Sequence, residues 1–339
     1  MAVTIYDIAR EAEVSIATVS RVFNKNPNVS VKAREKVLKI AKAMGYHPQA
    51  MAQGLARKKT KLITAIVPVL SNYFFTEVLD GIQDGMIDVD YDLNIYNVRT
   101  TDDIPGQVDY LLKRGMAEGY LIISVHLPEK KWKQFRNYQL PIVLIDEYSS
   151  EFDSVSVDSI EGAYNATEYL IKSDYQRIAM ITAYHEAKPA QDRILGYRRA
   201  LEDNSRIVDE TLIFSGDDMD RDGFTERNGY EAMLKLLKTD LLPDACFCNS
   251  DIQALGAIKA MQDANTFIPL IGFDDIRFSE LLGLTTMKQP MYDMGKLAIE
   301  KLLCRLNTPG SDVSHTVFSP EMIIRSSSSI DIHQEETGM

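Results

Sequence analysis

Residues 4–24 of this chain read TIYDIAREAEVSIATVSRVFN, and this stretch decides the fold of the N-terminal part. Thr4 can cap a helix with Asp7 as its reciprocal acceptor, and apolar residues then recur at helical spacing. Ser15 offers a second N-cap, so the pattern predicts a second short helix after a tight turn. The second helix turns its apolar stripe inward, and four residues point outward: Ile16, Ala17, Ser20 and Arg21.

Two short helices joined by a tight turn are typical of a unit that places its second helix in the major groove of DNA. Arg21 can bind a guanine edge through two hydrogen bonds. Ile16 and Ala17 can make only apolar contacts, such as with a thymine methyl group. The alternative is a small helical packing unit without a role in recognition, and the pattern alone leaves both interpretations open.

The charge of the chain is unevenly distributed. Its 339 residues carry a net charge of −12, but residues 1–61 hold 12 Lys and Arg against 4 Asp and Glu, a net charge of +8. The remaining residues hold 25 Lys and Arg against 45 Asp and Glu, a net charge of −20. A basic N-terminal part on an acidic body indicates where a polyanion binds, and together with the helix pair it favours DNA.

Length and composition indicate a globular protein with more than one domain. A chain of 339 residues fits a small head plus one or two α/β domains. We find no run of 18 apolar residues and no N-terminal secretory signal, so we expect no membrane span and a cytoplasmic location. Cys246 and Cys248 lie in an apolar run without a second Cys or His pair at zinc spacing, so we interpret them as buried thiols and expect no metal or cofactor.

A third helix is expected from a cap at Ser30 to about Met44. The hydroxyl and amide groups at its start suit a DNA phosphate. Residues 49–57, QAMAQGLAR, form a further short helical pattern that cannot hold a helix in water without support. This segment is either a plain linker or a helix that folds only against DNA, where two copies from a dimer can push Leu55 between base steps of the minor groove.

From Leu62 onward the pattern alternates between strands and helices. Strands are expected at 62–69, 93–98, 120–124, 142–146, 155–158, 178–183, 211–215, 245–248 and 270–273. Helices are expected near 74–89, 106–116, 129–138, 160–172, 191–204, 228–238, 251–263 and 292–306. This doubly wound α/β pattern has more strands than one such sheet normally holds, so we expect two similar lobes of parallel sheet with a ligand site in the cleft between them.

Signatures of phosphate binding and catalysis are missing from the sequence. It contains no G-x-x-x-x-G-K-[ST], G-x-S-x-G or H-E-x-x-H motif, and its five histidines are scattered, so we expect no catalytic residues. The acidic loop 218–223, DMDRDG, begins like a calcium loop, but its twelfth position is Gly229 in place of a bidentate glutamate. We interpret it as a solvated loop, with calcium binding as the alternative.

Several segments resemble the lactose/galactose repressor family of bacterial regulators. Besides residues 4–24, the resemblance is carried by VSVKAREKVLKIAKAMGYHP, MAQGLARKKT, PVLSNYFFTEVLDGI, DRILGYRRAL, FTERNGYEAM, CNSDIQALGAIKAM, IGFDD and LTTMKQPMYDMGKLAIEKLL, and it covers residues 2 to about 328. The family implies a helix-turn-helix head and a two-lobed body like periplasmic sugar-binding proteins. It also implies a homodimer on a near-palindromic operator in double-stranded DNA, with a sugar or sugar phosphate as effector in the cleft.

The resemblance also implies a division of the chain into domains. In order, these are a head at 1–47, a hinge helix and linker at 48–61, an N-terminal lobe at 62–158 and 290–318, a C-terminal lobe at 159–289 and 319–329, and a disordered tail at 330–339.

The resemblance assigns DNA contacts by position. Ile16 and Ala17 look like the specificity pair, Arg21 like the guanine contact and Leu55 like the minor-groove wedge. Further positions implied to contact the DNA backbone or nearby bases are Thr4, Tyr6, Ser15, Ser20, Asn24, Ser30, Tyr46 and Ala52. Glu13 departs from the family pattern, which usually has glycine there, so a left-handed backbone at this position would be strained.

The resemblance also places six effector-binding residues around the cleft: Phe74, Asp146, Arg193, Phe224, Ser250 and Asp274. Aromatic faces can cover the apolar side of a sugar, while Arg193 and Asp274 can each bridge two hydroxyls in one plane. Against this, an Asp or Arg at a strand end is often a structural cap or ion pair, and Asp251 can serve mainly to cap its helix.

The sequence therefore predicts a DNA-binding transcriptional regulator of carbohydrate metabolism genes, acting as a repressor, and not an enzyme. Three alternatives remain at this point, one of which is an enzyme tethered to DNA, which would need a nucleophile, base or metal set in the cleft. The second is a sugar-binding protein of the transport type. The third is a regulator of the catabolite-control type whose co-effector is a partner protein.

Overall fold

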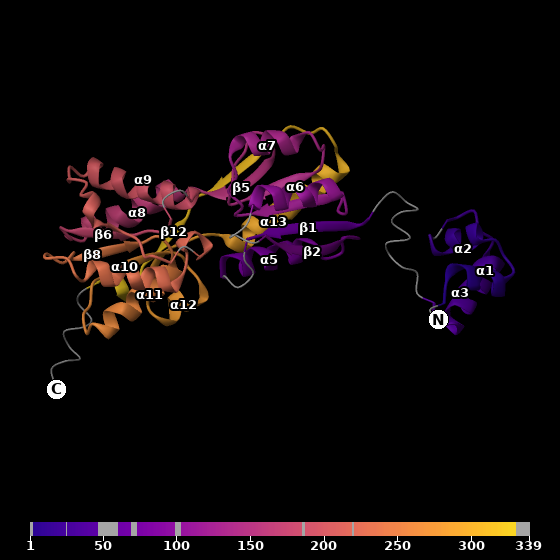
Figure 1. Ribbon diagram of the computed structural model, residues 1–339, viewed down its shortest axis with the longest axis horizontal. Coiled ribbons are helices and arrows are strands. Elements are labelled where there is room, and N and C mark those ends of the chain that lie inside the picture. Colours follow the sequence, from indigo (N-terminus) through magenta and orange to yellow (C-terminus); the bar gives the residue numbers. More distant parts are fainter. Residues whose placement is uncertain are drawn as a thin grey trace. The chain divides into compact units, whose positions relative to one another are not determined.

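The computed structural model describes residues 3–24, 26–46, 60–68, 73–98, 103–184, 187–218 and 220–329. The chain separates into two units, one made of residues 1–62 with 116–118 and the other of the remaining residues. We call the helices of the first unit the head and the second unit the body, and each is described by itself (Figure 1). The expected hinge helix, with Ala52 and Leu55, and the expected disordered tail lie outside the described residues.

The head consists of three helices: α1 (Ile5–Ala12), α2 (Ile16–Phe23) and α3 (Val31–Ala43). Their caps are the residues that the sequence predicts. The amide and hydroxyl groups of Thr4 donate to the Asp7 carboxylate at 3.0 and 2.6 Å. Ser15 and Ser30 each accept a hydrogen bond from the amide three positions later, at 3.1 and 3.3 Å. These local bonds fix where each helix begins.

The core of the head is small and is made of Ile8, Ala9, Ala12, Val19, Val22, Val37 and Ala41. Glu13 connects α1 to α2 with φ 55° and ψ 42°, so the expected left-handed residue is present where glycine would fit without strain. Its carboxylate lies 2.9 Å from Nζ of Lys36 on α3.

The body contains twelve described strands, which form two sheets. The first sheet holds β1 (Leu62–Val67), β2 (Asp92–Asn97), β3 (Gly119–Ile123), β4 (Ile142–Ile145), β5 (Asp153–Val157) and β11 (His315–Phe318) in the order β11-β5-β4-β3-β1-β2. The second holds β6 (Ile178–Ile181), β7 (Ile213–Phe214), β8 (Ala245–Cys248), β9 (Leu270–Asp274), β10 (Thr285–Lys288) and β12 (Glu321–Ile323) in the order β12-β10-β9-β8-β6-β7. The described pairings are parallel except for β10 with β12, which confirms the doubly wound prediction.

Helices cover both faces of the second sheet (Figure 1). One face packs against α8 (Ser159–Lys172) and α9 (Lys188–Asp203), and the other packs against α10 (Glu226–Leu236) and α11 (Asp251–Asp263). In the first sheet, α5 (Tyr73–Gly85) and α13 (Met291–Asn307) share a core with the strands. Two further helices, α6 (Ile104–Arg114) and α7 (Glu129–Arg136), contact each other. The described helices include none whose length and hydropathy would let it span a lipid bilayer.

Several elements differ from the sequence-based expectation. The strand expected at 211–215 is a short 3-10 helix, Glu210–Leu212, followed by the two-residue strand β7. The strands β10, β11 and β12 and the short helix α12 (Arg277–Leu281) were not expected. The exposed edge strands β11 and β12 and the Thr-rich β10 lack the apolar run by which the other strands are detected.

The missed strands show where the chain passes between the sheets. It leaves the first sheet after β5, returns to it between β10 and α13, and crosses again in the two residues between β11 and β12. These passages bring the carboxyl ends of β3, β4, β8 and β9 around one pocket, as expected for doubly wound sheets.

Candidate DNA-reading surface and ligand pocket

The outer face of α2 presents the residues that the sequence predicts as base contacts. Ile16 is 42% exposed although it is a large apolar residue, and Ala17 and Arg21 are also exposed. The opposite face is closed by Val19 and Val22. This helix therefore offers apolar groups and one guanidinium to a partner without disturbing its own core.

The other head residues predicted to contact DNA differ in exposure. Those that are exposed are Thr4, Tyr6, Ser15 and Ser30, and those that are half-buried are Ser20, Asn24 and Tyr46. Tyr46 also packs on Phe23, with ring centroids 5.5 Å apart, and Asn24 donates to the Ser20 hydroxyl at 3.4 Å. The half-buried residues thus have structural contacts within the head.

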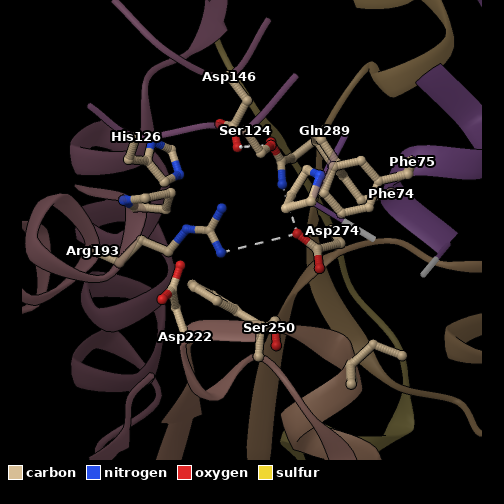
Figure 2. A pocket seen from close by; sticks show the side chains of 14 residues that line it. Phe74, Phe75, Ser124, His126, Asp146, Arg193, Asp222, Ser250, Asp274 and Gln289 are labelled. Atoms are coloured by element: carbon tan, nitrogen blue, oxygen red, sulfur yellow. Dashed lines mark hydrogen bonds and ion pairs between the residues drawn. The ribbon is translucent and has the colours of Figure 1, made fainter. Parts of the chain in front are cut away.

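The body contains a pocket of about 90 Å³, and all six residues predicted to bind an effector line it (Figure 2). They come from α5, the residue after β4, α9, the segment before α10, the N-cap of α11 and the end of β9. Both sheets therefore contribute walls. A cavity of this size holds several water molecules or a small polar ligand.

One wall of the pocket is aromatic. Phe74 and Phe75 at the start of α5 pack edge to face with ring centroids 5.4 Å apart. Phe224 lines the pocket from the second lobe and packs against a small alanine cluster. Such surfaces favour the apolar face of a ring-shaped ligand.

The polar residues at the strand ends have unusual backbone angles. Ser124 follows β3 with φ 47°, Asp146 follows β4 with φ 56°, and Asp274 ends β9 with φ 128°. The Ser124 hydroxyl donates to the Asp146 carboxylate at 2.7 Å. Strained backbone of this kind is concentrated at binding sites, where it directs side chains into the cavity.

Arg193 on α9 is the cation of the second lobe that points into the pocket (Figure 2). It is 3% exposed, and its guanidinium lies over the Phe273 ring at 3.7 Å. Nη1 donates to the carbonyl oxygen of Asn249 at 2.5 Å and lies 4.0 Å from Oδ1 of Asp274. Burial lowers the pKa of Arg193, and nearby carboxylates, first that of Asp274, oppose this shift.

Asp274 is the acidic counterpart of Arg193. Gln289 donates its side-chain amide to Oδ1 of Asp274 at 2.6 Å. Burial is the main cause that raises the pKa of Asp274 to about 7, and Asp251 and Asp146 add to it while Arg193 opposes it. Asp274 therefore exchanges a proton near neutral pH.

Ser250 and Asp251 divide structural and lining roles at the start of α11. Ser250 caps the helix by accepting from the Gln253 amide at 3.3 Å, and it also lines the pocket. Asp251 is fully buried and accepts hydrogen bonds from the hydroxyls of Ser279 and Thr286 at 2.5 and 2.6 Å. The structure thus gives Asp251 a structural role in holding the turn after β9.

Sequence reasoning missed four polar residues of the pocket: Ser124, His126, Asp222 and Gln289. Nδ1 of His126 lies 3.1 Å from Oε2 of Glu147. Burial alone would lower the pKa of His126, but the carboxylates of Glu147, Asp146 and Asp222 outweigh it, so this pKa is raised. The available signal was the spacing of Ser124 and His126, two residues apart just after β3.

The acidic loop 218–223 contributes Asp222 to the lining of the pocket. Asp222 has φ 55° and lines the pocket, and its carbonyl oxygen accepts from the Tyr184 amide at 2.7 Å. Asp218 accepts from the Thr225 hydroxyl at 2.6 Å. Within the residues that the structure describes, no group of three or more His, Cys, Asp or Glu side chains is arranged to hold a metal ion.

Comparisons with known proteins identify the family. Residues 4–49 match the lacI family of bacterial regulatory proteins, and residues 167–328 match a periplasmic binding protein-like domain. Catabolite control protein A of Priestia megaterium is 36% identical over 323 residues, which cover 93% of this chain and 96% of the relative. The chain belongs to the lacI family. As a member of it, this protein is a DNA-binding transcriptional regulator with a helix-turn-helix head.

Further relatives of this lacI-family regulator agree with the assignment. The ribose operon repressor of Halalkalibacterium halodurans is 31% identical over 331 residues, which cover 95% of this chain and 96% of the relative. A lac repressor dimer bound to operator and the anti-inducer ONPF has a TM-score of 0.82 at 23% identity over 97% of this chain and 99% of that one, which shows the shared fold. A complex of the transcriptional regulator CelR with cellobiose has a TM-score of 0.70 at 25% identity, over 96% and 100% of the two chains. The transport-type alternative is therefore set aside.

Proposed function

We propose that this lacI-family regulator is a homodimeric repressor of carbohydrate metabolism genes that binds a near-palindromic operator and responds to a small sugar-like effector. The observation that carries this proposal is the pairing, in one chain, of an exposed reading face on α2 with a pocket that combines an aromatic wall and the Arg193–Asp274 pair. Aromatic faces and in-plane charged groups are the usual means of binding a sugar ring.

The proposal assigns functions to parts of the chain. The head, 1–47, reads the operator, and the hinge, 48–61, connects it to the lobes. The lobes, 62–158 with 290–318 and 159–289 with 319–329, enclose the effector. The passages of the chain between the two sheets, after β5, before α13 and between β11 and β12, support this division.

The same residues carry the proposed contacts. Arg21 contacts a guanine, Ile16 and Ala17 contact neighbouring bases, and the exposed caps Ser15 and Ser30 approach phosphates. In the body, Arg193 and Asp274 bind ligand hydroxyls. The relatives named as a ribose operon repressor and as a CelR–cellobiose complex support a carbohydrate as the ligand.

Regulation follows from a difference in affinity. A ligand that prefers one arrangement of the two lobes shifts the DNA affinity only by the ratio of its own affinities for the two arrangements. The direction of the shift decides whether the ligand releases the operator or strengthens binding to it.

The experiment is selection of a duplex from a random pool by the full-length protein, followed by fluorescence anisotropy on that duplex with and without a sugar panel at fixed salt. We expect a near-palindromic site and a change in Kd with at least one sugar. A Kd that does not depend on sugar but changes when a partner protein is added would favour the catabolite-control alternative. The sequence identity to catabolite control protein A is the reason to include this test. Equal affinity for every duplex would refute the proposal.

A further inference from the structure

Acceptors dominate the polar lining of the pocket. Asp146, Asp222 and Asp274 contribute carboxylates. The side-chain amide of Gln289 directs its nitrogen to Asp274 at 2.6 Å, because a carboxylate accepts, and this turns the amide oxygen elsewhere. That oxygen is buried and, among the described residues, has no hydrogen-bond partner. A ligand that donates a hydrogen bond there would satisfy a buried acceptor.

The two basic side chains that line the described pocket each have acidic neighbours, although Nε of Arg193 is buried and has no hydrogen-bond partner among the described residues. Nη1 of Arg193 donates to the Asn249 carbonyl and faces Asp274 (Figure 2). His126 is held by the carboxylate of Glu147 at 3.1 Å. A phosphate that pairs with Arg193 or His126 would compete with Asp274 and Glu147 and would also meet the other carboxyl groups of the pocket. Like charges repel more strongly in a site sheltered from water than in bulk solvent.

The geometry points to an effector that donates hydrogen bonds and carries no anionic group, namely an uncharged or amine-bearing sugar and not a sugar phosphate. This inference rests on the proposed function, since it specifies the ligand class of the same pocket. Hydroxyl groups match the Gln289 amide oxygen and the carboxyl oxygens that line the pocket, and an ammonium group can donate to the same oxygens.

The test is isothermal titration calorimetry of the full-length protein with matched sugars at constant ionic strength. The sets are glucose, glucosamine and glucose 6-phosphate; ribose and ribose 5-phosphate; and cellobiose and cellobiose 6-phosphate. In the set that binds, we expect an unphosphorylated member to bind at least about tenfold more tightly than the phosphorylated one. If the glucose set binds, we expect glucosamine to bind at least as tightly as glucose.

A matched pair of variants locates the selectivity. Asp222→Asn removes one carboxylate from the pocket and keeps its backbone, because asparagine also tolerates the left-handed conformation found there at φ 55°. We expect the relative affinity for the phosphorylated sugar to rise about fivefold, the effect of one unit charge roughly 4 Å away in a water-like dielectric. Asp240→Asn is the control, since Asp240 is exposed and precedes β8, at the opposite end of that strand from Ser250.

The outcomes separate this inference from the proposed function. Tighter binding of a phosphorylated member would overturn the inference and still support a carbohydrate effector. Selectivity that is the same in Asp222→Asn and Asp240→Asn would also overturn it, because the charge of the pocket would then not set the preference. If no sugar of any set binds, the carbohydrate effector itself is refuted, and the inference fails with it.

Discussion

The outer face of α2 and the pocket of the body use side chains in opposite ways. On α2 the residues proposed to contact bases, Ile16, Ala17 and Arg21, are exposed, and the buried residues Val19 and Val22 lie on the other face. In the pocket the polar groups are buried and already bind one another, as in the contacts of Arg193 with Asn249 and Asp274. A partner of the head therefore meets exposed groups, whereas a ligand of the body competes with existing contacts, apart from the Gln289 amide oxygen and Nε of Arg193, which have no hydrogen-bond partner among the described residues. This competition couples ligand binding to the arrangement of the lobes.

The largest effect that sharpens this comparison is expected for Arg21→Ala. Loss of a bidentate guanine contact typically costs about 2 kcal/mol, so affinity for the selected duplex should fall about thirtyfold while affinity for random duplex changes little. Folding should be unaffected because Arg21 is exposed. Fluorescence anisotropy on both duplexes gives the two affinities.

Arg10→Ala provides the matched control for that measurement. Arg10 is a head arginine whose side chain is 78% exposed and pairs with Asp7 on α1. Its removal takes away the same charge without touching α2. If Arg21→Ala and Arg10→Ala lower the affinity for the selected duplex and for random duplex by the same factor, Arg21 acts only through its charge. The proposed contact with a base would then be wrong.

The comparison also explains what the sequence could predict. The head depends on contacts within a few residues, such as Ser15 with the amide three positions later, so caps and helix faces follow from spacing alone. Residues of the pocket come from separate strand ends, and the family resemblance was needed to bring Phe74, Arg193 and Asp274 together. The roles of His126 and Gln289 did not follow from spacing alone, because their partners Glu147 and Asp274 are distant in sequence.

The fold of the body could likewise be predicted only where a local pattern marks the element. Apolar runs such as those of β3 and β4 identify strands that are buried along their whole length. The edge strand β11 has alternately exposed residues and pairs with β5, more than 150 positions earlier in the sequence. No local pattern encodes a pairing over that separation. The points at which the chain passes from one sheet to the other could therefore not be predicted from the sequence.

A second effect concerns pH, and it tests whether the pocket is coupled to stability. The pKa of Asp274 is raised from 3.8 to about 7. Between these two values the folded state retains a proton that the unfolded chain releases, so stability is greatest below the window and falls as pH rises through it. One such proton gives a slope of at most about 1.4 kcal/mol per pH unit in the free energy of unfolding.

The measurement is urea unfolding of the full-length protein and of Asp274→Asn at several pH values inside this window. The groups that set the pKa of Asp274 are Arg193 on α9, Asp251 on α11, Asp146 after β4 and Gln289 before α13, and all are retained in the variant. The pKa values of Asp146 and His126 are also raised and change stability in the same direction, so the difference between the two proteins isolates Asp274. Parallel pH profiles would show that its buried carboxyl does not titrate there.

The smallest effect is expected in the head, where strain lies in the backbone and not in buried charge. Glu13 adopts φ 55°, a region that glycine occupies without a Cβ penalty, and its carboxylate pairs with Lys36. Glu13→Ala removes the ion pair and keeps the Cβ, whereas Glu13→Gly removes both. Both variants lack the ion pair with Lys36, which is exposed and contributes little to stability. The difference in stability between the two variants therefore reports only the backbone strain at position 13. We expect amide hydrogens of α1 and α2 in the full-length protein to exchange about fivefold more slowly in Glu13→Gly than in Glu13→Ala. Equal exchange rates would mean that the turn between the two helices accepts a side chain at no cost in stability. Backbone strain would then be a property of the pocket and not of the head.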